Sequence, residues 1–433
     1  MNSESDDTGS YSYSFISKHA AILVLLGVIS LGLSASPANA SQPNLNYTSI
    51  AAVPGGGFWI QRDGEHDGLD TRTIAIQGAP QFEHVGVAGS IASPPRYRGF
   101  WVVGVDGSIH ARGVGIPELC GGHLRNCSGY GNLRIAAAAA SPNADGLWAV
   151  DNEGHVWTAG NTVSYGDVAH DSVVPTGIAA TPSGKGYYIV MADGGVHTRG
   201  DAVFYGSTGG NPPGGNSITG IALSYDITGD VNGYWLVASD GSVLTFGDAP
   251  FLGSTGGNGD AISGIVALPD GRSYAWVYSD GRVERSQGPP PVTLESIAWQ
   301  TMIGVPNGDT QPGTPLLMES AHGGAGQKWN VVPVDVIGIG ERVQIISAES
   351  GLCMDLEGGY PNGRILQYTC KTVEQHWGNQ IWEPMKDQNG VIQLIPGLHP
   401  DRTLFGYRPE YGGGVTLTYK DNTLAGWTIT NAM

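Results

Sequence analysis

Residues 233–254 read GYWLVASDGSVLTFGDAPFLGS, and this stretch decides the fold. A glycine and the apolar run Tyr-Trp-Leu-Val precede Asp240-Gly241, and a second apolar run follows the pair. Asp-Gly between two apolar runs is typical of a β-hairpin, because both turn residues can adopt positive φ there. The stretch therefore predicts two antiparallel strands joined by a tight turn.

The same phrase recurs along the first two thirds of the chain, at spacings of about 40 to 47 residues. Its other copies begin at Gly57, Gly99, Gly146, Gly186 and Tyr274. One apolar run precedes each phrase and another follows it, which suggests four short strands per repeat. Repeats of this length and strand content are typical of β-propeller blades. Six phrases predict six blades over residues 41–286, and a seventh blade built from both chain ends is the alternative.

The repeat text also resembles a repeat that is common in secreted actinobacterial proteins. The resemblance covers roughly residues 48–286 and is strongest in the fourth and fifth repeats. It implies a propeller architecture and export from the cell, and it implies no activity.

The character of the sequence changes at residues 287–293, where Gln-Gly-Pro-Pro-Pro predicts a stiff linker, because three prolines cannot join a strand ladder. Residues 294–433 fall into three units, each marked by a tryptophan: Trp329, Trp382 and Trp427. Gln-x-Trp occurs in the first two units. This pattern resembles the ricin-type β-trefoil lectins, which implies that each Trp lies in a shared core and each Gln braces a turn. The expected fold class is all-β, a propeller followed by a β-trefoil.

The middle unit matches the lectin pattern best. In ricin-type lectins an Asp accepts hydrogen bonds from sugar hydroxyls, an aromatic ring stacks on the sugar and an amide pair completes the site. The resemblance implies a carbohydrate site formed by Asp355, Gln367, Tyr368, Asn379 and Gln380. The family usually has one residue between the Gln and the aromatic, whereas Gln367 and Tyr368 are adjacent. Either a bulge restores the geometry, or only one of the two faces the ligand.

The other two units depart from this pattern. In the first, Leu317 stands in place of the Gln and Glu319 in place of the aromatic, and no Asp precedes them. In the third, Thr416 replaces the Gln, the Asp is missing, and Ala425 replaces the Gln of Gln-x-Trp. Both units are predicted to be structural only.

The charge of the chain bears on its partners. The net charge is −18, only 14% of residues are charged, and Lys and Arg form no run. So acidic a protein repels phosphate backbones, and nucleic acid is not an expected partner. The expected partner is a neutral polysaccharide or glycoconjugate, bound by a monomer without a cofactor.

The N-terminus carries the features of a secretory signal peptide. Lys18 precedes a nearly continuous apolar run over residues 20–33, and Ala38-Asn39-Ala40 is a small-x-small cleavage pattern. Cleavage after Ala40 predicts a secreted, extracellular protein whose mature chain has no membrane span. An uncleaved membrane anchor is the alternative, although the apolar run is short for a span.

The four cysteines form two close pairs, Cys120 with Cys127 and Cys353 with Cys370. Close pairing in an exported chain favours two local disulfides over a metal site, because no Cys-x-x-Cys spacing is present.

No catalytic or metal-binding residues are predicted. The repeated aspartates are explained by hairpin turns, and neither His-Glu-x-x-His nor Gly-x-Ser-x-Gly occurs. His110, His155 and His197 are expected on matched strand positions along one face of the blades. Trp157 is expected where other repeats have threonine.

The favoured function is a secreted, lectin-like protein without catalytic activity that binds neutral glycan through the middle trefoil unit. One alternative is a glycoside hydrolase with a catalytic propeller and a targeting trefoil. Another is an extracellular protein-interaction scaffold with a vestigial lectin domain.

Overall fold

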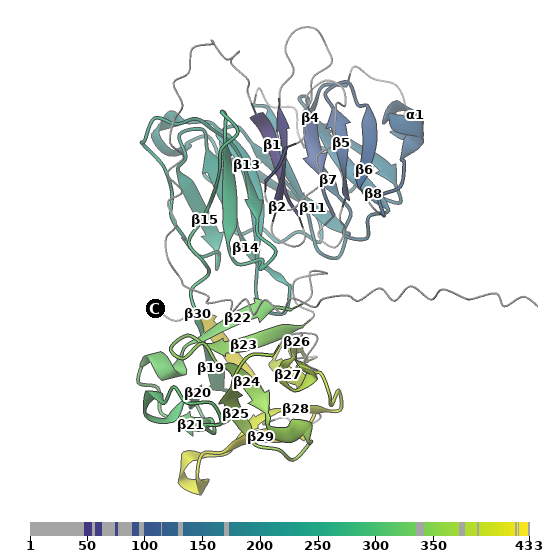
Figure 1. The fold of residues 1–433 in the computed structure, drawn as a ribbon. Helices are drawn as coiled ribbons and strands as arrows, with labels where there is room; N and C mark the ends of the chain where they lie inside the picture. The colour runs from purple at the N-terminus through teal and green to yellow at the C-terminus, as the bar shows by residue number, and fades with distance from the viewer. Residues whose placement is uncertain are drawn as a thin grey trace, which may run out of the picture. The chain divides into compact units, whose positions relative to one another are not determined.

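The computed structural model describes residues 47–53, 57–62, 74–76, 89–94, 99–113, 115–128, 133–168, 173–334, 342–371, 377–387, 389–420, 422 and 424–431. The predicted signal peptide at residues 1–40 lies outside these ranges. Within them, no helix has the length and apolar character needed to cross a membrane. The described chain is all-β, which confirms the predicted class (Figure 1); its helical elements are α1 (Arg125–Ser128) and short 3₁₀ turns.

Six three-stranded antiparallel sheets form the first part of the described chain. Their strands, in chain order, are β1 (Tyr47–Val53), β2 (Gly57–Arg62) and β3 (Ile74–Ile76); β4 (Gly89–Ala92), β5 (Gly99–Gly104) and β6 (Ile109–Gly113); β7 (Ile135–Ala140), β8 (Gly146–Asp151) and β9 (Val156–Gly160); β10 (Pro175–Ala180), β11 (Gly186–Met191) and β12 (Val196–Gly200); β13 (Ile218–Tyr225), β14 (Val231–Ala238) and β15 (Val243–Gly247); and β16 (Ile262–Ala267), β17 (Tyr274–Tyr278) and β18 (Val283–Arg285).

The first strand of each sheet contacts the first strand of the next, and β1 contacts both β4 and β16. The ring therefore closes with six blades.

The middle strand of each blade carries the repeated aromatic phrase. Every residue of β5, β8, β11 and β17 is buried, because neighbouring blades pack on both faces. The indole N–H of Trp101, Trp148 and Trp235 donates to the carbonyl oxygens of Pro117, Val163 and Pro250, at 2.9, 2.9 and 2.7 Å. These bonds hold the segment after the third strand against the blade.

That segment was predicted as a fourth strand, and in the described residues it is not one. Residues 202–207 and 249–254 lie outside any β-ladder. Proline at position 250 has no N–H to donate, and Gly206 and Gly253 have φ of 128° and 111°, which do not suit a strand. The indole and tyrosine hydrogen bonds take the place of a ladder.

Tyrosine hydroxyls join consecutive blades. Tyr187, Tyr234 and Tyr274 each donate to a glycine carbonyl of the preceding blade: Gly166, Gly206 and Gly253. Each hydroxyl also accepts an N–H from the same segment, from Tyr165, Tyr205 and Leu252 at 3.0, 3.3 and 3.1 Å. Burial raises the pKa of Tyr234 to about 12, so its hydroxyl remains a donor at ordinary pH.

We expect Tyr234→Phe to lower the free energy of unfolding by about 1 kcal/mol, because it leaves a half-buried carbonyl and a half-buried N–H without their shared partner. Thermal or urea unfolding of the propeller measures this loss. Tyr360→Phe is the control, since Tyr360 is 67% exposed. Equal stability of both variants would mean that the hydroxyl bridge contributes nothing.

The repeated aspartates act in turns, as predicted. Asp106, Asp193, Asp240 and Asp280 each accept, through Oδ1, the N–H of the residue two positions later, at 2.9–3.0 Å. The glycine after each has φ between 81° and 88°, a conformation that favours glycine. The first-repeat pair Asp63-Gly64 lies outside the described residues. Both predicted disulfides, Cys120–Cys127 and Cys353–Cys370, are present.

The second part of the chain is a β-trefoil (Figure 1). Its three units comprise β19 (Val292–Ser296), β20 (Met302–Gly304), β21 (Leu317–Glu319) and β22 (Trp329–Pro333); β23 (Val343–Ser347), β24 (Cys353–Leu356), β25 (Ile365–Tyr368) and β26 (Trp382–Lys386); and β27 (Ile392–Pro396), β28 (Arg402–Gly406), β29 (Val415–Tyr419) and β30 (Trp427–Asn431).

The outer strands of the units pair in the closed order β19-β30-β27-β26-β23-β22 and make a barrel, while β20–β21, β24–β25 and β28–β29 are hairpins. Strand β19 begins at Val292, directly after the prolines.

The three marker tryptophans lie in one core, as predicted. Trp329, Trp382 and Trp427 are all buried and belong to a single hydrophobic cluster. Their indole N–H groups donate to the carbonyl oxygens of Ile303, Met354 and Leu404, at 3.2, 3.3 and 3.1 Å. These acceptors hold the same place in β20, β24 and β28. The three bonds therefore define which residues of the three units are equivalent.

Candidate functional site

The hairpin β24–β25 in the middle unit carries three of the predicted site residues. Its register pairs Cys353 with Tyr368, Met354 with Gln367 and Asp355 with Leu366, without interruption. No bulge is present in this hairpin, so Gln367 and Tyr368 point to opposite faces. Tyr368 shares a face with Asp355, as its diagonal neighbour across the hairpin.

Asp355 is the centre of a polar network. Its carboxylate, 5% exposed, accepts hydrogen bonds from Nδ2 of Asn379 at 2.8 Å and from Nε2 of Gln380 at 2.8 Å. The Nζ of Lys371 lies 3.2 Å from the same carboxylate and donates to Oδ1 of Asn379 at 2.9 Å. A buried carboxylate needs such partners, because burial alone would strongly disfavour its charge.

Gln380 braces the turn that brings Lys371 to the carboxylate. Its Oε1 accepts the backbone N–H of Lys371 at 2.8 Å, and its Nε2 also donates to the Thr369 carbonyl at 3.0 Å. Gln380 is fully buried at the end of the 3₁₀ turn Trp377–Gln380. The structure thus brings Asp355, Asn379 and Gln380 together around one carboxylate.

Gln367 lies apart from this network. It is fully buried and accepts a hydrogen bond from the Ser350 hydroxyl at 2.8 Å. Its Nε2 donates to the carbonyl oxygens of Asp309 and Gln311, at 2.6 and 3.1 Å. These contacts tie the hairpin to the first unit. Of the two adjacent residues only Tyr368, 45% exposed, faces outward beside Asp355.

Sequence reasoning missed Lys371. Its ammonium has three N–H donors, and the described contacts use two, to Asp355 and Asn379. The side chain is 28% exposed, so Lys371 lies at the solvent-facing edge of the network. A sequence signal for Lys371 exists. The residue directly follows Cys370, in the turn that the Gln of Gln-x-Trp braces.

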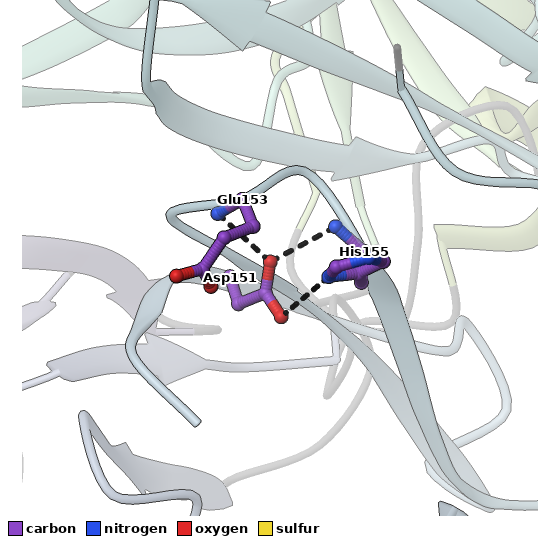
Figure 2. Close-up of side chains that lie close together, drawn as sticks. All are labelled: Asp151, Glu153 and His155. Atoms are coloured by element: carbon purple, nitrogen blue, oxygen red, sulfur yellow. Dashed lines mark hydrogen bonds and ion pairs between the residues drawn. The ribbon is translucent and has the colours of Figure 1, made fainter. Parts of the chain in front are cut away.

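A second polar cluster lies in the third blade, where Asp151, Glu153 and His155 bring their potential metal-ligand atoms within 4.8 Å of one another (Figure 2). Oδ1 of Asp151 accepts the backbone N–H of Glu153 and His155, at 3.0 and 2.9 Å. Its Oδ2 accepts the indole N–H of Trp157 at 2.8 Å and lies 3.2 Å from Nδ1 of His155. In the other described repeats the aspartate directly before the turn glycine accepts a turn N–H group. Here that position holds Glu153, and Asp151 accepts the turn N–H groups instead. The turn therefore explains why the three side chains lie close together.

The strand register corrects two sequence predictions in this blade. Trp157 pairs with Ala149, as His197 pairs with Ile189 in the next blade. Trp157 therefore occupies the position of the histidines rather than that of Thr198. His155 lies in the turn, two residues earlier. Counting from the turn glycine of each repeat gives this alignment.

The first strands of the blades surround a cavity of about 440 Å³ at the propeller centre. Its wall is formed by small and aliphatic residues with hydroxyls such as Thr176, Thr219 and Ser263. The described residues that line it include no charged side chain.

Comparison with known proteins finds one family match, which overlaps the second part of the chain. A family model described as a ricin-type beta-trefoil lectin domain-like family matches residues 275–368. This match begins in β17 and ends at Tyr368. A search of curated proteins finds no match.

Three solved structures illustrate the structural likeness. The Rhizoctonia solani agglutinin is 17% identical, over 34% of this chain and 97% of its own, with a TM-score of 0.28. A Polyporus squamosus lectin, bound to a human-type influenza-binding epitope, is 19% identical, over 34% of this chain and 50% of its own, with a TM-score of 0.27. The exo-beta-1,3-galactanase 1,3Gal43A from Clostridium thermocellum is 11% identical, over 89% of this chain and 95% of its own, with a TM-score of 0.28.

The described chain is an all-β protein that joins propeller blades to a β-trefoil, and part of it matches a ricin-type lectin domain.

Proposed function

We propose that this chain is a secreted, lectin-like protein without catalytic activity that binds neutral glycan through the middle trefoil unit. The observation that carries the proposal is the network of Asp355, Lys371, Asn379 and Gln380 beside the outward-facing Tyr368. It combines a charged acceptor, a charged donor and an aromatic ring, which are the groups that recognise a sugar.

Each group has a distinct task. One sugar hydroxyl donates to Asp355 through a lone pair that the described bonds leave on Oδ1, and a neighbouring hydroxyl accepts from the Lys371 ammonium. The Tyr368 ring covers the apolar face of the sugar. Asn379 and Gln380 fix the carboxylate and the ammonium before the ligand arrives, which lowers the entropic cost of binding.

Two further features support a neutral ligand and export. The net charge of −18 repels anionic ligands at a distance, whereas a neutral sugar is unaffected. Two disulfides suit an oxidising compartment outside the cytosol. The signal peptide at residues 1–40 and the division into residues 41–286 and 294–433 belong to the same proposal, with a linker at 287–293 whose last two residues already form the start of β19.

Neither alternative has a specific observation in its favour. A propeller glycosidase of the usual kind would need two carboxylates facing its substrate, and the described lining of the central cavity offers none. An interaction scaffold would not need an ordered acid–base–amide network next to an exposed ring.

A glycan array probed with the whole protein tests the proposal, with retention of a neutral glycan as the expected result. In a follow-up titration, Tyr368→Ala should weaken binding at this site about tenfold, because stacking is lost. Tyr419→Ala, which removes a 58% exposed ring from the third unit, is the matched control. The proposal fails if no neutral glycan is retained, or if both variants bind like the parent.

A further inference from the structure

The first trefoil unit contains a carboxylate at the place of Asp355, supplied by a different strand. The hairpin β20–β21 pairs Met302 with Glu319, Ile303 with Met318 and Gly304 with Leu317. The bonds of Trp329 and Trp382 make Ile303 equivalent to Met354. Gly304 is therefore the equivalent of Asp355, and Glu319 is the equivalent of Tyr368.

Gly304 makes room for the Glu319 carboxylate. A Cβ at position 304 would collide with Oε2 of Glu319 and lie 3.2 Å from Cγ of Gln327. Gly304 does not have a positive φ, so its backbone conformation does not require glycine. Glycine is required at position 304 because the Glu319 carboxylate occupies the space of a Cβ. The carboxylate that β24 supplies in the middle unit thus comes from β21 in the first unit.

The supporting residues repeat those of the middle unit. Gln327 is fully buried; its Oε1 accepts the N–H of His322 at 3.0 Å, and its Nε2 donates to the Ser320 carbonyl at 2.9 Å. Gln380 makes the same two bonds, to Lys371 and Thr369. His322 is therefore the equivalent of Lys371, and the first and middle units each place a basic side chain next to a carboxylate.

The histidine orients this carboxylate. Nδ1 of His322 accepts the backbone N–H of Gly324 at 3.0 Å, which places the hydrogen of the neutral ring on Nε2. Nε2 lies 3.4 Å from Oε2 of Glu319. The described bonds leave Oε1 of Glu319 available. The side chains of Glu319 and His322 are 26% and 52% exposed, so a ligand can reach both.

We propose that the first unit is a second binding site for neutral saccharides, in which Glu319 accepts hydrogen bonds from two neighbouring hydroxyls. His322 is a positioning residue that holds the carboxylate, and Gln327 braces the turn. Sequence comparison predicted this unit to be structural only, because it lacks the aspartate. Two sites on one chain would give avidity for a repetitive glycan that one weak site does not.

The ring-proton NMR signals of His322 test this site, assigned with His322→Gln. The probe is a panel of neutral methyl hexopyranosides with galactose, glucose and mannose configurations, added to the whole protein. We expect at least one to shift the His322 signals saturably. Glu319→Gln should weaken that response about tenfold or more, because hydrogen bonds to a charged acceptor are lost.

Two controls separate this inference from the proposed middle site. Asp401→Asn removes a 66% exposed carboxylate from the third unit and should leave the response unchanged. Asp355→Asn should also leave it unchanged, whether or not the middle site binds sugar. The second site is overturned if no probe shifts the His322 signals, or if Glu319→Gln, folded by circular dichroism, responds like the parent.

Discussion

Asp355→Asn is expected to weaken glycan binding at the middle unit by about 10- to 100-fold, since hydrogen bonds to a charged acceptor contribute about 1.5–3 kcal/mol. Asparagine keeps the size of the side chain but replaces one acceptor oxygen with an NH₂ donor. In one orientation this donor faces the donors of Gln380 and Lys371, and in the other it faces the donor of Asn379. Titration in a Glu319→Gln background, with a glycan taken from the array, isolates the middle site.

The matched control for this prediction is Asp401→Asn, which changes the net charge equally on the exposed surface of the third unit. It should bind like the parent. Because breaking a buried ion pair also destabilises a fold, the melting temperature of Asp355→Asn has to be measured alongside. A folded Asp355→Asn variant with parental affinity would remove the carboxylate from the binding site.

Trp382→Ala should cost the trefoil about 3–5 kcal/mol of stability, because it empties a fully buried site in the common core and orphans the Met354 carbonyl. Domains are stable by only about 5–15 kcal/mol, so the trefoil should unfold early. Urea unfolding, monitored through the hydrogen exchange of residues 292–431, measures this loss of stability.

Tyr360→Ala removes an aromatic ring that is 67% exposed and should change stability by less than about 0.5 kcal/mol. Trp382→Phe keeps most of the volume and loses the indole donor, so it should fall between the two. A loss below about 1 kcal/mol in Trp382→Ala would contradict the placement of Trp382 in the core.

Much of the fold was predictable because its signals are local and repeated. Asp-Gly between apolar runs specifies a hairpin wherever it occurs, and Trp329, Trp382 and Trp427 recur with the period of the trefoil units. The prediction of a fourth strand was wrong for the described segments at residues 202–207 and 249–254, since an apolar run does not reveal that side-chain hydrogen bonds replace a ladder. The segment around Pro250 shows this, because the Trp235 indole and the Tyr274 hydroxyl hold it.

The candidate sites were only partly predictable. The motif positions predicted Asp355, Asn379 and Gln380. The adjacency of Gln367 and Tyr368 left open which of the two faces the ligand, and the uninterrupted register shows that Tyr368 lies on the face of Asp355. Neither Lys371 nor Glu319 matches a sugar-binding residue of the motif, and both were missed, although the place of Lys371 in the turn braced by Gln380 was a usable signal. Their roles depend on which residue lies across the hairpin and how far a long side chain reaches.

Amide hydrogen exchange of the whole protein, with and without a saturating array-identified neutral glycan, tests the central claim most directly. The middle site predicts slower exchange in residues 353–371 and 377–382, which contain Asp355, Tyr368, Lys371 and Gln380. Protection confined to the propeller strands, with residues 353–382 unchanged, would contradict it.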